Sequence, residues 1–151
     1  PLLDNEIICR CGKRGCLETG ASGSALHRLF LEKLRSGSVS MLSEKFNKGE
    51  EITLKDILDA VLKEDVLAIE ILESVGHTLG KAIAGLINMF NPEMIVIGSI
   101  YARNENLMKP YTEEVIAREA LSHARRVCRV VPAALGEAIG DYAALSVAAN
   151  A

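Results

Sequence analysis

The chain has 151 residues and a mass of 16.3 kDa, with 49% apolar residues, 25% charged residues and a formal net charge of −3. This length can bury a hydrophobic core, and the composition excludes a disordered chain, a collagen-like chain and a disulfide-dense mini-protein. The pI of 5.7 argues against a free-standing nucleic-acid binder, and no apolar run of about 18 residues predicts a membrane span. Because the chain begins with Pro1 and no signal segment follows, we expect it to be a piece of a longer protein.

Residues 1–20 are predicted to form an irregular segment organised by a metal, with a short strand at 7–8. Three of the four cysteines lie in it: Cys9, Cys11 and Cys16. Short cysteine spacings in a chain without secretory features favour a metal site over disulfides. Thiolates favour zinc, and a structural zinc takes four ligands, of which this segment supplies three. A thiol redox module is the alternative, because the neighbouring basic residues would stabilise thiolates.

Two amphipathic helices are predicted next. The first begins at Ser22 or Ser24 and runs to about residue 35, with apolar residues at helical spacing. A polar stretch follows, and Thr53 and Asp56 then predict a capping box that opens a helix over 54–63. The side chains of this second helix that we expect to point inward are Ile57, Leu58, Val61 and Leu62.

The longest helix is predicted over 66–90, where apolar residues recur at steps of three and four. It should end at Asn91-Pro92, since the residue before a proline avoids the helical region. Three glycines within it would permit close packing against a neighbour: Gly76, Gly80 and Gly85. Residues 94–98 then form a predicted strand that is apolar on both faces, which is typical of a covered parallel sheet.

The rest of the chain is predicted to alternate helices and strands. A helix is expected over 107–120 with Pro110 in its first turn, a second buried strand over 127–131, and a final helix over 138–149. This order is a βαβα unit, so we predict an α/β fold with extra helices. The three histidines lie in helical stretches, where packing or surface roles are expected: His27, His77 and His123. His27 or a water molecule is the first candidate for a fourth zinc ligand if the chain binds zinc by itself.

The string Cys9-x-Cys11-Gly12-x-x-Gly15-Cys16-Leu17-Glu18 resembles the zinc-binding signature of the ROK family, which comprises bacterial sugar kinases and sugar-responsive transcriptional regulators. Three later segments resemble that family in the same order: residues 21–23, 88–98 and 135–140. The resemblance implies the C-terminal part of an actin-like ATPase fold of the ROK or hexokinase type. Residues 1–20 would be its zinc-binding loop and residues 21–151 its C-terminal lobe. The N-terminal lobe and any winged helix-turn-helix would lie outside the chain.

The resemblance also implies roles for single residues. The three cysteines would bind a structural zinc, and Glu18 would accept hydrogen bonds from sugar hydroxyls. Four residues would lie on the nucleotide side: Gly98, Ser99, Gly136 and Gly140. The family usually has a glycine in place of Ser99, where a side chain would crowd a nucleotide. No residue of the chain matches the family's catalytic base, so we expect the chain alone not to phosphorylate a sugar.

Two functions follow from the resemblance. We expect the sugar-sensing effector lobe of a regulator similar to the N-acetylglucosamine repressors, which binds a hexose or amino sugar beside the zinc. The alternative is the C-terminal lobe of an ATP-dependent sugar kinase of the glucokinase or N-acetyl-hexosamine kinase type, which alone would need ATP and Mg²⁺. In either case we expect a cytoplasmic homodimer or homotetramer without membrane contact. DNA would be bound only through the N-terminal domain outside the chain.

Overall fold

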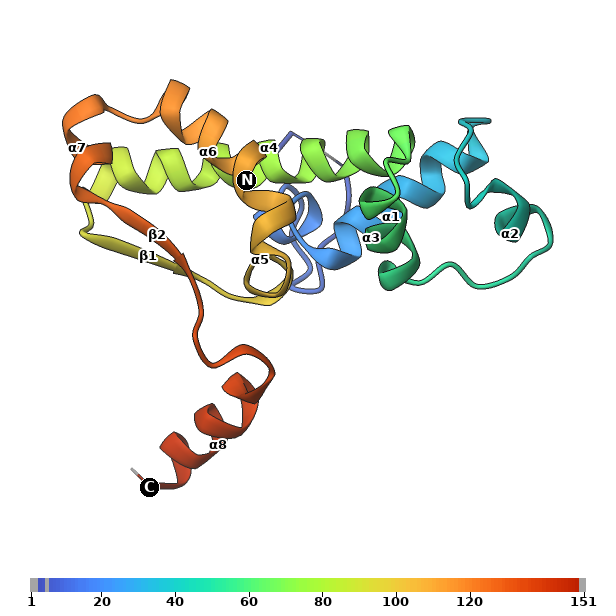
Figure 1. The fold of residues 1–151 in the computed structure, drawn as a ribbon. Coiled ribbons are helices and arrows are strands. Elements are labelled where there is room, and N and C mark those ends of the chain that lie inside the picture. The colour runs from blue at the N-terminus through green and yellow to red at the C-terminus, as the bar shows by residue number, and fades with distance from the viewer. Residues whose placement is uncertain (1–2, 5, 150–151) are drawn as a thin grey trace.

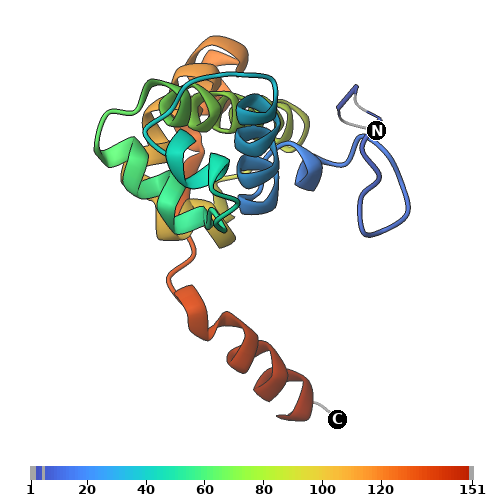
Figure 2. The same ribbon diagram turned by 90° about the vertical axis from the view of Figure 1, so that its right-hand side faces the viewer.

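The computed structural model describes residues 3–4 and 6–149. Its longest element, α4 (Val66–Phe90), runs along the molecule, and three further helices lie beside it (Figure 1). These are α1 (Gly23–Arg35), α3 (Leu54–Leu62) and α6 (Glu105–Glu119), and with α4 they make up what we call the helical body. Two parts project from this body, the segment before α1 and the last helix, α8 (Ile139–Ala149) (Figure 2).

Local sequence signals set the beginnings of α1 and α3. The Ser22 hydroxyl accepts a hydrogen bond from the Ala25 N–H at 3.0 Å and so caps α1. Thr53 and Asp56 form the predicted capping box, in which each side chain bonds to the other residue's backbone N–H. Both predicted helices are therefore confirmed. The inward orientation predicted for Leu62 is wrong, since this last residue of α3 is 67% exposed.

The centre of the core lies where α4 packs against α6. A Cβ atom on Gly80 would lie 2.8 Å from both the carbonyl oxygen of Thr112 and Cβ of Val115, closer than real atoms approach. Gly76 lies equally close to α6, so glycine at these two positions lets the helix backbones come together. At Gly85, by contrast, a Cβ atom would meet no described atom within 4 Å. Close packing is thus confirmed for two of the three glycines.

The chain leaves α4 through Asn91, whose left-handed φ of 44° ends the helix at the predicted place. Strand β1 (Met94–Ile97) follows and pairs in parallel with β2 (Arg129–Pro132), as the predicted βαβ order requires. The expectation of a sheet covered on both faces is wrong for one face, where Val96 is 59% exposed. The second strand also begins later than predicted, because Val127 still belongs to the helix before it.

The remaining elements are short: η1 (Leu17–Thr19), α2 (Ser43–Asn47), α5 (Ser99–Arg103), α7 (Ser122–Val127) and η2 (Gly136–Ala138). Helices α2, α5 and α7 were not predicted from the sequence. Pro110 lies in the second turn of α6 and not in its first, because α6 begins at Glu105. The final predicted helix is confirmed as α8. None of the helices in the described ranges is long and apolar enough to cross a membrane.

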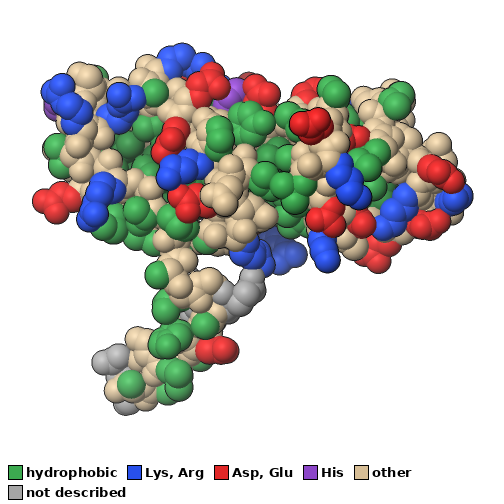
Figure 3. Space-filling model, viewed as in Figure 1, with side chains coloured by type: hydrophobic (Ala, Val, Ile, Leu, Met, Phe, Trp, Pro, Cys, Tyr) green, Lys and Arg blue, Asp and Glu red, His purple; other side chains and the backbone are tan. Residues whose placement is uncertain are grey.

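Apolar side chains are exposed around the sheet, on α8 and at scattered positions of the helical body. In Figure 3, charged side chains are spread over the helical body among hydrophobic ones, whereas α8 shows mostly hydrophobic side chains. On α8 these are Tyr142, Leu145 and Val147, each more than half exposed. The molecule therefore joins a helical body with a buried core to a sheet that is open on one face.

Candidate metal centre and ligand pocket

Three thiols gather in the segment before α1. The sulfur atoms of Cys9, Cys11 and Cys16 all lie within 4.8 Å of one another, and those of Cys11 and Cys16 are 3.5 Å apart. Gly12 and Gly15 turn the backbone between them, with φ angles of 80° and 68° that suit glycine. The predicted convergence of the three cysteines is confirmed.

Few contacts hold this thiol loop, which we define as residues 6–16. The Cys9 N–H donates to the Lys13 carbonyl at 2.8 Å, and Ile8 pairs with Arg14 in a single antiparallel bridge. The strand predicted at 7–8 is therefore reduced to one bridging residue. An ion pair between Arg14 and Glu6 adds to the loop, but both side chains are more than half exposed.

The thiols alter one another's protonation. A hydrogen bond from the backbone N–H of Lys13, with smaller effects from the other two thiols, lowers the pKa of Cys11 below its ordinary value. The hydrogen bond with Cys11 raises the pKa of Cys16 to about 11. The geometry thus favours one thiolate and opposes the second. A bound cation would remove that opposition, because a metal ion is the largest local charge in such a site.

The donor set fits a zinc ion. Zn–S bonds of about 2.3 Å at tetrahedral angles place sulfur atoms roughly 3.8 Å apart. The Cys11–Cys16 distance of 3.5 Å is close to this spacing, and all three sulfur atoms lie within 4.8 Å of one another. Within residues 3–4 and 6–149, the group contains no histidine or carboxylate besides the three thiols. His27, the first candidate for a fourth ligand, does not belong to this group, and its Nε2 atom lies 2.6 Å from the carbonyl oxygen of Ile52.

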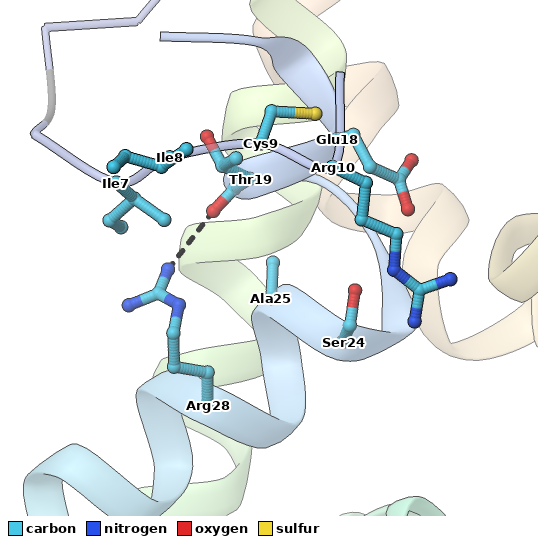
Figure 4. A pocket seen from close by; sticks show the side chains of 9 residues that line it. All are labelled: Ile7, Ile8, Cys9, Arg10, Glu18, Thr19, Ser24, Ala25 and Arg28. Carbon is cyan, nitrogen blue, oxygen red and sulfur yellow. Dashed lines mark hydrogen bonds between the residues drawn. The ribbon is translucent and has the colours of Figure 1, made fainter. Parts of the chain in front are cut away.

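A pocket of about 260 Å³ opens beside Cys9 (Figure 4). Two charged side chains, Arg10 and Glu18, reach its rim, and Ile7 and Ile8 lie on the opposite side. The complete lining comprises residues of the thiol loop, of η1 and of α1: Ile7, Ile8, Cys9, Arg10, Glu18, Thr19, Ser24, Ala25 and Arg28. The structure thus brings the predicted sugar-binding residue and one predicted zinc ligand to the same pocket.

The turn that carries Glu18 is tied to both neighbouring segments. Toward the thiol loop, the Thr19 hydroxyl donates to the Cys16 carbonyl at 2.7 Å. Toward α1, the Ser22 hydroxyl donates to the Glu18 carbonyl at 2.7 Å, and Arg28 donates to the Thr19 carbonyl at 3.0 Å. Sequence reasoning missed Arg28, because a side chain that binds a backbone carbonyl leaves no pattern in the sequence.

The residues predicted for the nucleotide side lie at the ends of the two strands. Gly98 precedes α5 directly after β1, and Ser99 adopts a left-handed φ of 56°. Gly136 has a φ of 49° in η2, which contacts α5, so these three residues lie in one corner of the molecule. Gly140 lies in the first turn of α8. Their contact with a nucleotide stays a prediction.

Comparison with known proteins shows which family the chain belongs to. The model of the ROK family matches residues 1–150. The chain belongs to the ROK family. The DNA-binding transcriptional dual regulator NagC of Escherichia coli is 38% identical over 137 residues, which cover 89% of this chain and 32% of NagC. A glucokinase of Halalkalibacterium halodurans is 38% identical over 103 residues, which cover 68% of this chain and 31% of the kinase. The chain thus spans about a third of the length of these ROK relatives.

Solved structures of ROK proteins agree in fold. A ROK family transcriptional regulator described as a homologue of the E. coli MLC protein superposes with a TM-score of 0.70 at 33% identity, over 85% of this chain and 32% of that one. A ROK glucokinase from Streptomyces griseus in complex with glucose and AMPPNP gives 0.75 at 24% identity, over 89% of this chain and 44% of the kinase. The prediction of part of an actin-like ATPase fold, rich in helices and with a small parallel sheet, is confirmed.

Proposed function

We propose that this chain is the sugar-sensing effector part of a ROK transcriptional regulator, and that it binds a hexose or amino sugar beside a structural zinc. One observation carries the proposal: three thiols lie within 4.8 Å of one another, and Glu18 follows two residues after the last of them at the rim of a pocket. Residues 1–20 would be the zinc-binding loop, and residues 21–151 the lobe on which that loop rests.

In this proposal Cys9, Cys11 and Cys16 bind the zinc, which when bound holds the loop in one shape. Glu18 accepts hydrogen bonds from sugar hydroxyls. A carboxylate suits this task, because its two oxygens accept from two neighbouring hydroxyl groups. The exposed position of Glu18 leaves its carboxylate free to meet a ligand that enters the pocket.

The corner at β1 favours the regulator over the kinase. Ser99 carries a side chain in a left-handed conformation, which costs a non-glycine residue roughly 1 kcal/mol or more. A phosphate-binding loop depends on close backbone approach, and an exposed side chain at this point would stand in the way.

The second candidate is part of an ATP-dependent sugar kinase. The glucokinase from H. halodurans, 38% identical over its matched residues, supports it. Only this candidate requires ATP and Mg²⁺, with Gly98, Ser99, Gly136 and Gly140 on the nucleotide side. Under either candidate the protein acts in the cytoplasm as a homodimer or homotetramer. In the regulator, DNA is bound through a domain outside this chain.

Sugar titration of the full gene product tests the proposal. Glucose and N-acetylglucosamine are titrated by calorimetry into the parent protein, Glu18→Gln and the control Glu44→Gln on α2. We expect at least one sugar to bind and Glu18→Gln to weaken it about tenfold or more, since a hydrogen bond to a charged group is lost. Equal affinity in Glu18→Gln and the parent would contradict the role of Glu18. Rapid ATP-dependent phosphorylation of either sugar would support the kinase instead.

A further inference from the structure

Arg28 lies where α1 meets the turn that carries Glu18, and nothing in the sequence pattern marks it. We infer that Arg28 is the positioning residue that fixes the η1 turn, and with it the Glu18 carboxylate, against α1. The inference rests on the proposed sugar site and names a residue on which that site depends. Arg28 does not itself need to touch the sugar for this role.

The contacts of Arg28 join two parts of the chain. Its Nη2 atom donates to the Thr19 carbonyl at 3.0 Å, across the interval between η1 and α1 (Figure 4). Its Nη1 atom lies 2.9 Å from each carboxylate oxygen of Glu32, one turn further along α1. The Glu32 carboxylate thereby holds the guanidinium in the direction that reaches η1. The Arg28 side chain is only 28% exposed, so it has little freedom to leave this place.

The neighbouring carbonyl is held in the same way. The Ser22 hydroxyl donates to the Glu18 carbonyl at 2.7 Å and also caps α1. Two successive carbonyls of η1, those of Glu18 and Thr19, are therefore bound by side chains from the first turns of α1 or its cap. The two bonds together tie both of these residues of the turn to α1, and Arg28 supplies the one that comes from within the helix.

The chemistry of arginine explains why this side chain serves the role. A guanidinium presents five N–H donors in a rigid plane, so one nitrogen binds a carboxylate while another binds a carbonyl. A lysine at the same position would keep the positive charge, but its single ammonium group on a flexible chain lacks the planar arrangement of donors. Arg28→Lys therefore separates the geometry of the group from its charge.

Hydrogen bonds also connect Arg28, through Thr19, to the thiol loop. Thr19 is bonded to Cys16 from both its N–H and its hydroxyl, at 3.0 Å and 2.7 Å, and Cys16 is the last thiol of the metal group. Arg28 thus binds the far end of a turn whose near end is the metal site. The Arg28 bond is to the Thr19 carbonyl and not to any of the three thiols. We therefore expect a substitution of Arg28 to change the position of the turn without removing the metal.

The test uses the full gene product with glucose and N-acetylglucosamine as probes, and compares Arg28→Ala, Arg28→Lys and Glu32→Gln with the parent. Arg35→Ala is the matched control, since Arg35 is an exposed arginine in the last turn of the same helix. We expect about tenfold weaker sugar binding in Arg28→Ala and Arg28→Lys, about threefold in Glu32→Gln, and no change in Arg35→Ala. Zinc content should stay at the parent value in all four variants. Guanidinium chloride at a non-denaturing concentration should partly restore sugar binding to Arg28→Ala.

The outcomes separate this inference from the proposed function. Weaker binding in Arg28→Lys with an unchanged melting temperature supports it, even if Arg28→Ala fails to fold. Parent affinity in Arg28→Lys, while Glu18→Gln binds weakly, overturns the inference and leaves the proposed function standing. Loss of zinc together with affinity also overturns it, because the effect would then pass through the metal site. Parent affinity in Glu18→Gln overturns the sugar site itself.

Discussion

The helical body and the thiol loop are held together by different forces. In the body, apolar side chains from α1, α3, α4 and α6 are fully buried, among them Phe30, Leu72 and Met108. In the thiol loop nearly every residue is at least partly exposed, and the contacts that the structure describes there include backbone hydrogen bonds, the Ile8–Arg14 bridge and an exposed ion pair. Burial of apolar surface stabilises far more than exposed polar contacts do. We therefore expect the body to keep its shape without a metal, and the loop to depend on a metal held by its thiols.

The comparison predicts two independent classes of variant. Changes in the body should lower the free energy of unfolding and leave the metal content unchanged. Changes in the thiol loop should remove the metal and leave the body folded.

The largest effect is expected at the contact between α4 and α6. Gly80→Ala places a Cβ atom 2.8 Å from two atoms of α6, so the helices must separate and the free energy of unfolding should fall by about 1–3 kcal/mol. Gly85→Ala on the same helix is the control, where alanine meets open space and should raise the free energy of unfolding by about 0.5–1 kcal/mol. Urea denaturation of both variants measures the difference, and equal stabilities would show that the close approach is not needed.

A smaller effect is expected at the beginning of α3. The Thr53 hydroxyl and N–H, and then Lys45, hold the pKa of Asp56 well below its usual range. A lowered pKa means that the stabilisation is complete above the ordinary aspartate pKa of about 4 and is lost as the pH falls through the lower, folded value. Asp56→Asn should therefore cost about 1 kcal/mol at neutral pH, and progressively less in strong acid.

Asp59→Asn is the matched control for this prediction, since Asp59 is exposed on the same helix. Denaturation of both variants at neutral pH and in acid measures the free energy of unfolding. A cost for Asp56→Asn that does not change between the two pH values would contradict the capping role of the carboxylate.

The helical body could be predicted from the sequence because its signals are local. The capping residues Ser22 and Thr53 and the apolar spacing over 66–90 act within one or a few turns, and each predicted helix formed. Helices α5 and α7 were missed, because five or six residues are too few to show a period. Val127, which was predicted to begin the second strand, is the last residue of α7 for the same reason.

The convergence of the thiols was predictable because the three cysteines are close in sequence. The place of Glu18 beside them was predicted from the resemblance to the ROK signature and not from spacing alone. Arg28 and the pocket it lines depend on how α1 packs against η1, which no short motif encodes. The open face of the sheet could not be predicted either, because the residues of an apolar strand do not indicate whether another element covers it.

The central claim is that the thiol loop holds a metal that the body does not need. The most direct test is the zinc content of the purified chain, measured by mass spectrometry in Cys11→Ser and in the control Cys128→Ser, whose thiol lies away from the group. We predict one zinc per parent chain, held more weakly than by a site with four protein ligands, lost in Cys11→Ser and kept in Cys128→Ser, with the helical circular dichroism unchanged. A parent chain that contains no metal and forms a reversible disulfide between Cys11 and Cys16 would contradict the account and favour a redox role.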